Sequence, residues 1–589
     1  MYDTVIRGGT VVDGTGAAAY RADVAVQDGV IVEIGRVTSP ARESIDADGA
    51  LVTPGFIDLH THYDGQFLWD DTIDPSFSHG VTTAIAGNCG VGFAPVVPEH
   101  RQQLIEVMEG VEDIPGLVLD EGLDWDWRSF PDYLDRIAAR RYSMDVASHL
   151  THAPLRVFVM GERALEHQAA TAEDIRQMAD LLRQAMDAGA LGFSTGRLVE
   201  HISSSGAKIP GTFAEEVELI ALAEALGESG RGVFQIVPKG AIGAVIAEAD
   251  GRDERLAEHR LYERIATAAG RPVTYSITEV GSDPEDIWLM VAESEKAASA
   301  GLELRPQIAT RGTGLISLLD GYHVFLMKPS YREIAHLPVR ERIAAMREPA
   351  RRRAILDEEH VEGEYADQPI VGPMLRRMQV RLPLTYVLSS PLDYEPGPDR
   401  TVGMLAAAAG TTPEEFIYDH YTATDDGGNF NVIFALNYAN GNLDHVHGLL
   451  EKPVVLSSLA DGGAHMKVMC DASQPTFQLA FWTRDRTRGP LLPLELAVHK
   501  LTGAGAALYG LDDRGTVEVG RRADLNVIDY DRLQLDWPRM VGDLPSGSSR
   551  MLQGSTGYLA TLVAGTTTRR DDADTGARPG RLLRAGAGR

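Results

Sequence analysis

Two histidines at the end of an apolar run constrain the fold of this chain more than any other feature. The segment Gly55–Asp64 reads GFIDLHTHYD and carries His60 and His62. Side chains two residues apart on a strand lie on the same face, so both imidazoles can reach one point beyond the strand's carboxyl end. Imidazole is a common ligand of zinc and related cations. Two surface histidines at a strand-to-loop junction are the alternative, and the flanking sequence favours a metal site.

The length and the cysteine content limit the class of protein. A chain of 589 residues can hold two or three domains, or one large barrel with a smaller partner domain. No apolar run approaches the roughly 20 residues that span a bilayer. The first residues have neither the basic start nor the apolar core of a signal peptide. Two cysteines, Cys89 and Cys470, cannot form a disulfide framework, so we expect a cytoplasmic setting.

The charge balance excludes two kinds of partner. Lys and Arg number 55 against 85 Asp and Glu, which gives a net charge of −30. Such a field repels nucleic acid and anionic membrane surfaces, so we expect neither as a partner. The net charge says nothing about the reaction. The chain could also form a homo-oligomer, although no segment identifies an interface.

Both ends of the chain are rich in short strand patterns. Residues 1–55 alternate apolar and polar positions between turn signals such as Asp28–Gly29, and residues 505–589 repeat that style, for example at Thr561–Gly565. We predict one small composite β-sandwich built from both ends. Two separate sheets would give the same pattern.

The middle of the chain, residues 56–504, alternates strand-like and helical segments. Thr82–Ala86 and Gly232–Val237 are typical of buried strands, and Thr171–Ala188 has helical apolar spacing. This alternation predicts the α/β class and a (β/α)₈ TIM-like barrel. A segment at about 316–375 has the pattern of a helical insertion.

Two further residues follow predicted barrel strands, where the working groups of such barrels lie. Cys89 comes after the second strand and is either a thiolate ligand or a small buried apolar residue. Asp461 comes after Val454–Leu459 and precedes a Gly-Gly turn. An aspartate there could move a proton at a metal-bound water, or it could satisfy turn amides.

At this point the chain resembles the amidohydrolase superfamily, and within it the D-aminoacylase (N-acyl-D-amino-acid deacylase) branch. The resemblance runs over nearly the whole length. It rests on the HxH segment, on Gly87–Gly90 (GNCG), on Ala188–Gly196 (AGALGFSTG), on Gly520–Leu525 (GRRADL) and on Thr575–Arg581 (TGARPGR).

The resemblance implies a metal-dependent amidohydrolase that uses zinc, with one or two divalent ions. It matches His60, His62 and Cys89 to metal ligands, and Asp461 to the catalytic aspartate that also touches the metal. It matches His152, in the segment THAPLR, to a histidine that faces the substrate.

The chain departs from the pattern of this family at two strands. Members usually carry one metal-binding histidine after strand five and another after strand six. Here these strands end in Val237-Pro238-Lys239 and in Ile277-Thr278-Glu279, without a histidine. Either the metal site is reorganised around the remaining ligands, with Lys239 as a further candidate, or metal binding has weakened.

Four residues are candidates for substrate binding: His152, Lys239, His465 and Arg197. Lys239 could clamp a substrate carboxylate or be a solvated loop charge, and Arg197 could form a bidentate fork with a carboxylate or a structural ion pair. His465 lies close after Asp461.

Three functions remain open from the sequence. The first is deacylation of an N-acyl (D-)amino acid or a similar small amide by a metal-activated water, with Asp461 as the base. The second is hydrolysis of a cyclic amide, as in hydantoinase-like relatives. The third is a non-catalytic barrel that has lost its metal.

Overall fold

Parallel strands form the centre of the molecule. The computed structural model describes residues 1–240, 252–279 and 283–586. Six parallel strands lie in the order β17 (Leu456–Ser457), β13 (Leu304–Ile308), β12 (Val273–Ser276), β11 (Val233–Val237), β10 (Gly192–Gly196) and β9 (Leu150–Thr151). Three more are β6 (Phe56–Asp58), β7 (Val81–Ala86) and β8 (Asp145–Ser148). The predicted α/β class is confirmed.

Backbone hydrogen bonds join the two groups of parallel strands beyond their last strand residues. Thr61 and Gly462 form a parallel bridge, and the His62 N–H donates to the Gly462 carbonyl at 2.8 Å. The Asp461 N–H donates to the His60 carbonyl at 3.2 Å. The segments that follow β6 and β17 therefore run side by side, which brings the HxH segment next to Asp461.

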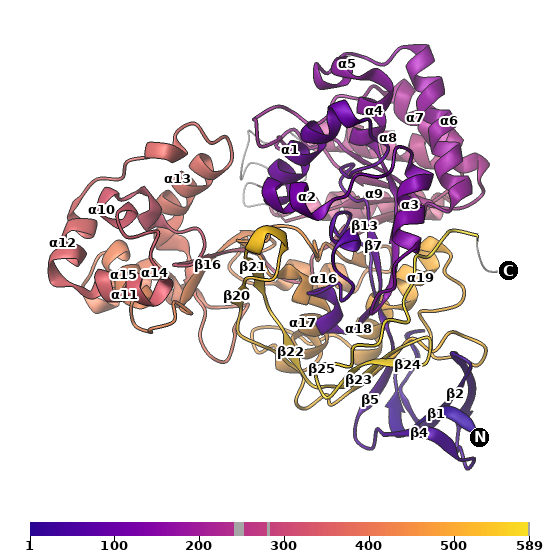
Figure 1. Cartoon of the computed structure of the whole chain (residues 1–589). Coiled ribbons are helices and arrows are strands. Elements are labelled where there is room, and N and C mark those ends of the chain that lie inside the picture. Colours follow the sequence, from indigo (N-terminus) through magenta and orange to yellow (C-terminus); the bar gives the residue numbers. More distant parts are fainter. Residues whose placement is uncertain (241–251, 280–282, 587–589) are drawn as a thin grey trace.

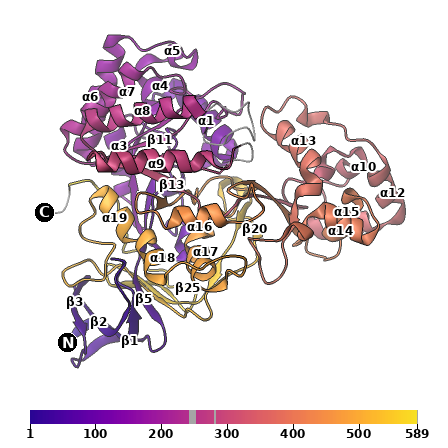
Figure 2. The same cartoon turned by 180° about the vertical axis from the view of Figure 1, so that it is seen from behind.

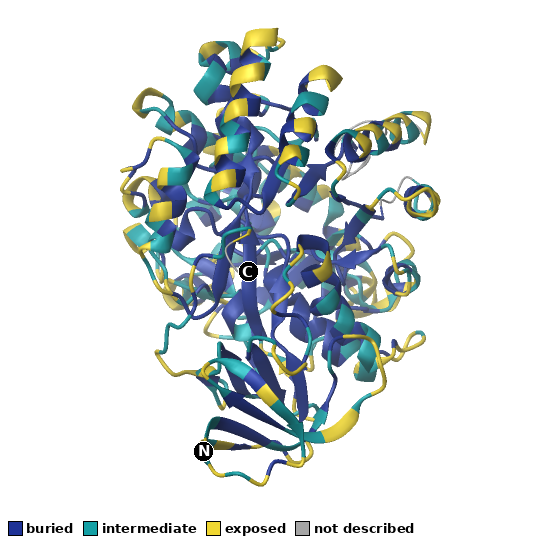
Figure 3. Cartoon of the chain, turned by 90° about the vertical axis from the view of Figure 1, so that its right-hand side faces the viewer, coloured by how far each residue is buried: buried dark blue, intermediate teal, exposed yellow. Residues whose placement is uncertain are grey.

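Helices cover the outer faces of the strands, as Figure 3 shows by their exposed outer surfaces around a buried centre. In Figure 2, α6 (Ala172–Ala188), α7 (Glu216–Glu228), α8 (Arg252–Ala269) and α9 (Asp286–Ser299) lie together on one side. Thr171 and Asp174 form a capping box that fixes the start of α6. None of the described helices is long and apolar enough to cross a membrane.

The remaining helices of this part lie between the strands or after them. Those before β10 are α1 (Arg101–Glu112), α2 (Gly116–Gly122), α3 (Phe130–Ala138), α4 (His152–Met160) and α5 (Glu162–Leu165). Those near the end are α16 (Asp444–Leu450), α17 (Gln474–Ala480), α18 (Leu494–Leu501) and α19 (Gly503–Tyr509).

Both ends of the chain contribute to one nine-stranded sheet (Figure 1). Its N-terminal members are β1 (Tyr2–Val11), β2 (Tyr20–Gln27), β3 (Val30–Gly35), β4 (Ala41–Asp46) and β5 (Leu51–Pro54). Its C-terminal members are β18 (Leu525–Ile528), β23 (Tyr558–Val563), β24 (Thr566–Arg570) and β25 (Ala573–Asp574). β5 pairs with β18, so the two ends meet in the middle of the sheet.

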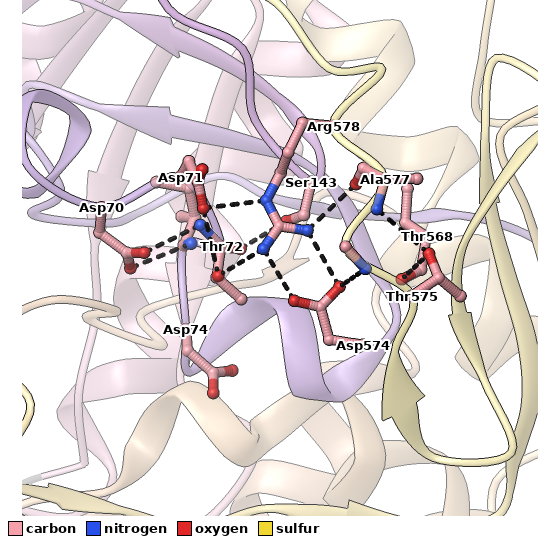
Figure 4. Close-up of polar contacts among 12 residues, drawn as sticks. Asp70, Asp71, Thr72, Asp74, Ser143, Thr568, Asp574, Thr575, Ala577 and Arg578 are labelled. Carbon is pink, nitrogen blue, oxygen red and sulfur yellow. Dashed lines mark hydrogen bonds and ion pairs between the residues drawn. The ribbon is translucent and has the colours of Figure 1, made fainter.

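The TGARPGR segment fixes the C-terminal end to the loop after the HxH segment. Arg578 donates to Asp71 Oδ1 and to Thr72 Oγ1, each at 2.9 Å, and it pairs with Asp574 at 2.7 Å (Figure 4). One guanidinium therefore joins residues far apart in the sequence through charge-assisted hydrogen bonds.

A helical lobe projects from the strands, at the left in Figure 1. It begins and ends on the antiparallel pair β14 (Thr313–Leu318) and β16 (Phe430–Leu436), with β15 (Tyr386–Val387) beside β16. Its helices are α10 (Pro329–Arg332), α11 (Val339–Arg347), α12 (Pro349–Asp357), α13 (Val371–Arg381), α14 (Val402–Ala409) and α15 (Pro413–Tyr421). It has its own apolar core. The lobe therefore continues well past 375, where we predicted the insertion to end.

Candidate metal centre and substrate cavity

His60, His62 and Cys89, the three residues predicted as metal ligands, have their side chains close together. Cys89 Sγ lies 3.3 Å from His60 Nε2 and 3.7 Å from His62 Nε2. All three residues are buried. They form a group of metal-binding side chains whose donor atoms lie within 4.8 Å of one another. Two imidazoles and a thiol are a donor set that suits zinc.

Asp461 faces the same point from the other sheet. Its Oδ1 lies 3.5 Å from His60 Nε2 and 3.8 Å from His62 Nε2, and its side chain is 25% exposed. The structure therefore brings together the three predicted ligands and the predicted catalytic aspartate. One side of the carboxylate remains open to the cavity described below.

The far ring nitrogens of both histidines face acceptor side chains. His60 Nδ1 lies 3.2 Å from Gln307 Oε1, and the Gln307 amide is itself oriented by donating to Thr274 Oγ1 at 2.9 Å. His62 Nδ1 lies 3.4 Å from Glu112 Oε1. The Gln307 oxygen can accept a hydrogen bond from His60 Nδ1, which leaves the lone pair of His60 Nε2 directed at the cluster.

The backbone around the cluster is unusual. Cys89, Asp461 and His465 have positive φ angles of 57°, 47° and 50°, and Leu459 has 61°. Side chains other than glycine seldom adopt this left-handed region, and such residues gather at functional sites. Tight turns therefore aim Cys89 and Asp461 at one point.

Burial sets the charge state of the cluster in the absence of an ion. It lowers the pKa of His60 to about 4, so this imidazole is neutral near pH 7. Burial also raises the pKa of Asp461 to about 6, although His465 opposes that shift. Burial raises the pKa of the Cys89 thiol, and a cation would reverse this by favouring the thiolate.

A cavity of about 310 Å³ opens over the cluster. His60, His62, Cys89 and Asp461 form its floor. Much of its wall is apolar, with Val111, Leu198, Val237, Leu315, Leu436, Leu459 and Met469. The polar and charged side chains of the wall include Glu112, Glu200, His201, Arg377 and His465. The volume suits a small organic molecule.

The ends of two parallel strands face the cavity without a histidine. β11 ends at Val237 and β12 ends at Ser276, and both residues line the cavity. Neither side chain has a donor comparable to a histidine nitrogen. The ends of β11 and β12, where the family pattern predicts two metal-binding histidines, form part of the cavity wall in this chain.

The predicted substrate-binding residues have different positions. His465 lines the cavity. His152 is buried elsewhere, with Nδ1 at 2.8 Å from Thr195 Oγ1 and Nε2 at 2.8 Å from Glu218 Oε1.

The other two predicted residues are held by acidic partners. Arg197 forms a bidentate pair with Glu258, with both contacts at 2.8 Å. Lys239 forms an ion pair with Glu254. The structure thus does not bring His152, Arg197 or Lys239 to the cavity wall, and for Arg197 it gives the structural pairing that the sequence left open.

Several residues of the wall were not predicted from the sequence, among them Glu112, Arg377 and His201. Glu112 ends α1, and Arg377 lies on α13 of the lobe. His201 follows β10, and burial lowers its pKa to about 3. A histidine shortly after a predicted strand was the one signal that could have been used. Positions on helices give no comparable signal.

Comparison with known proteins decides the family. A sequence model described as the amidohydrolase family matches residues 43–569. The chain belongs to the amidohydrolase family. The resemblance that the motifs predicted is therefore confirmed.

Individual amidohydrolases match over almost the full length. The D-aminoacylase of Alcaligenes xylosoxydans xylosoxydans is 28% identical over 585 residues, which cover 99% of this chain and 97% of the relative. The N-acyl-D-aspartate deacylase of the same organism is 28% identical over 588 residues, covering 99% and 95%.

A solved amidohydrolase structure supports the same fold. The N-acyl-D-glutamate deacylase of Bordetella bronchiseptica, solved with zinc and a phosphonate inhibitor, superposes with a TM-score of 0.64. It is 24% identical, and the match covers 99% of this chain and all of that one.

Proposed function

We propose that this protein is a zinc-dependent amidohydrolase that removes the acyl group from an N-acyl-D-amino acid. The observation that carries the proposal is the meeting of His60, His62 and Cys89 with Asp461 beneath a cavity of about 310 Å³. The names of the full-length relatives, a D-aminoacylase and an N-acyl-D-aspartate deacylase, supply the reaction class and the configuration.

The side chains present fit a zinc ion. His60, His62 and Cys89 would hold it through two nitrogens and one sulfur, and Asp461 would add an oxygen. Gln307 and Glu112 lie where acceptors orient ligating histidines. When bound, such an ion supplies Lewis acidity, which acidifies water and polarises an amide carbonyl.

Asp461 has the position and the environment of a general base. Its Oδ1 faces the cluster, and its partial exposure leaves room for a water molecule and the substrate. The carboxylate is placed to take a proton from the attacking water. The same oxygen then returns that proton to the leaving nitrogen.

The cavity wall favours an anionic substrate with an apolar part. Of the described residues that line it, Arg377 is the one arginine or lysine, and no described residue forms an ion pair or hydrogen bond with its guanidinium. Burial lowers its pKa, and Arg381 adds to that shift. A substrate carboxylate would compensate this half-buried charge. The apolar wall residues would contact the acyl chain or an apolar amino-acid side chain.

The strand arrangement supports a closed (β/α)₈ barrel as the frame of this site. We propose that the parallel bridge between Thr61 and Gly462 closes the ring of strands. We also propose residues 56–504 as the barrel with its helical lobe, and 1–55 with 505–589 as the composite β domain. The pairing of β5 with β18 supports this division.

A substrate screen tests the proposed function. Zinc-replete wild-type protein is assayed with matched N-acyl-D- and N-acyl-L-amino acids that have apolar and acidic side chains, and with a hydantoin. We expect turnover of the D series, and a loss of about 10²- to 10⁴-fold in kcat for Asp461→Asn. Turnover of the hydantoin alone would replace deacylation with cyclic-amide hydrolysis. No turnover of any substrate, with Asp461→Asn identical to wild type, would leave a non-catalytic protein.

A further inference from the structure

Glu112 is a buried acid whose carboxylate faces a metal-binding histidine. Its Oε1 lies 3.4 Å from His62 Nδ1, and the two side chains are 3% and 1% exposed. Neither atom has a hydrogen-bond partner among the described residues. The opposite nitrogen of the same ring, Nε2, points at Cys89 and Asp461. The carboxylate and the cluster therefore lie on opposite sides of the His62 ring.

The stability of α1 does not explain why a glutamate occupies position 112. Glu112 is the last residue of α1, where the helix dipole disfavours a negative charge. Its carboxyl is 3% exposed, and no described residue forms a hydrogen bond with its Oε1. A buried acid in such surroundings lowers the stability of the fold unless something compensates it.

The main chain of Glu112 holds the loop that carries the aspartate. Its carbonyl accepts a hydrogen bond from the His465 N–H at 2.5 Å. His465 Nε2 lies 3.9 Å from Glu112 Oε2, which is too long for a hydrogen bond. The end of α1 thus contacts both the HxH segment and the Asp461–His465 loop.

We propose that Glu112 is a positioning residue that holds His62 for metal binding. Its carboxylate accepts the Nδ1 proton, which fixes the ring orientation and directs the Nε2 lone pair at the ion. Glu112 would serve His62 as Gln307 serves His60. The inference depends on the proposed metal site but not on the identity of the substrate.

The test compares metal affinity among three variants. Zinc binding to metal-free protein is measured by competition with a chelator for wild type, Glu112→Gln, Glu112→Leu and Asp113→Asn. Asp113→Asn is the matched control, because Asp113 is the next residue and its carboxyl is influenced mainly by burial and by Lys467. It removes the same charge from nearly the same place.

We expect zinc affinity to fall by about 10- to 100-fold in Glu112→Leu, with a smaller loss in Glu112→Gln, whose amide oxygen can still accept the proton. Asp113→Asn should bind zinc like wild type. The thermal midpoints of the metal-free Glu112 variants should equal or exceed that of wild type, because Glu112 Oε1 has no hydrogen bond to lose among the described residues. A purely structural role predicts lower midpoints instead.

Three results would overturn the inference. Unchanged zinc affinity in both Glu112 variants would show that the carboxylate does not support the site. An equal loss in Asp113→Asn would show a general charge effect. The absorption spectrum of the cobalt-substituted protein reports its ligands. Loss of an oxygen ligand in the spectrum of Glu112→Gln would show that Glu112 binds the metal directly. If wild-type protein binds zinc but hydrolyses no N-acyl amino acid, the proposed function fails while this inference stands.

Discussion

Gln307 Oε1 lies 3.2 Å from His60 Nδ1, on the side of the ring that faces away from Cys89. Because the Gln307 amide nitrogen donates to Thr274 Oγ1 at 2.9 Å, the orientation of the amide is fixed. The oxygen must accept, so the His60 Nδ1 carries the proton. Strand β13 thereby contributes to the metal centre without supplying a ligand.

The first prediction concerns this acceptor. Gln307→Leu should lower zinc affinity by about 10-fold, because His60 loses the group that sets its tautomer. Gln307→Glu keeps an acceptor at the same distance and should retain most of the affinity. Competition with a chelator measures both variants. Equal affinity in Gln307→Leu and wild type would rule out a role for this contact.

The second prediction concerns the cation of the cavity wall. Arg377→Ala should raise KM for an N-acyl amino acid by about 10- to 100-fold, the value of a lost charge-assisted hydrogen bond, with a much smaller effect on kcat. Arg376→Ala is the control, because Arg376 is exposed on the same helix and pairs with Glu362. Steady-state kinetics would contradict the assignment if both variants kept the wild-type KM.

The third prediction concerns acid stability of the helical lobe. Burial lowers the pKa of His323 from 6.5 to about 3, and Arg342 adds to the shift. The unfolded chain takes up a proton at His323 below pH 6.5 while the folded chain does not, so stability falls as the pH drops from 6.5 toward 3.

His323→Gln removes this difference and should reduce the stability loss between pH 7 and pH 5 by about 2 kcal/mol. Urea unfolding at the two pH values measures it. His336→Gln, which changes an exposed histidine of the same lobe, is the control. Identical pH dependence in all three proteins would show that His323 does not contribute.

The fourth prediction concerns the C-terminal segment. Arg578→Ala should lower the free energy of unfolding by about 1 to 2 kcal/mol, because the contacts to Asp71, Thr72 and Asp574 are charge-assisted but partly solvated. Arg581→Ala changes an exposed arginine nearby and should leave the thermal midpoint unchanged. A midpoint for Arg578→Ala equal to that of Arg581→Ala would mean that the segment is held by other contacts.

The core of the site could be predicted from the sequence because each of its residues is identified by its position relative to one predicted strand. An i, i+2 pair on a strand, and residues directly after other parallel strands, must gather at one edge of the strands. His60, His62, Cys89 and Asp461 obey this rule, and the structure brings them together. Family membership followed from the same short motifs.

The rest of the site depends on tertiary packing. Glu112 and Arg377 come from helices, and only the placement of α1 and of the helical lobe brings them to the cavity. Three predicted site residues, His152, Arg197 and Lys239, instead have acidic partners, which the sequence could not show. Those partners lie 15 or more residues away in the chain.

Metal content tests the central claim most directly. Protein purified and incubated with zinc, then freed of excess ion, is analysed for bound metal beside the double variant His60→Ala/His62→Ala. A centre built on these imidazoles predicts about one tightly held ion per wild-type chain and a loss of that ion in the variant. Wild-type protein that retains no more zinc than the double variant would contradict it.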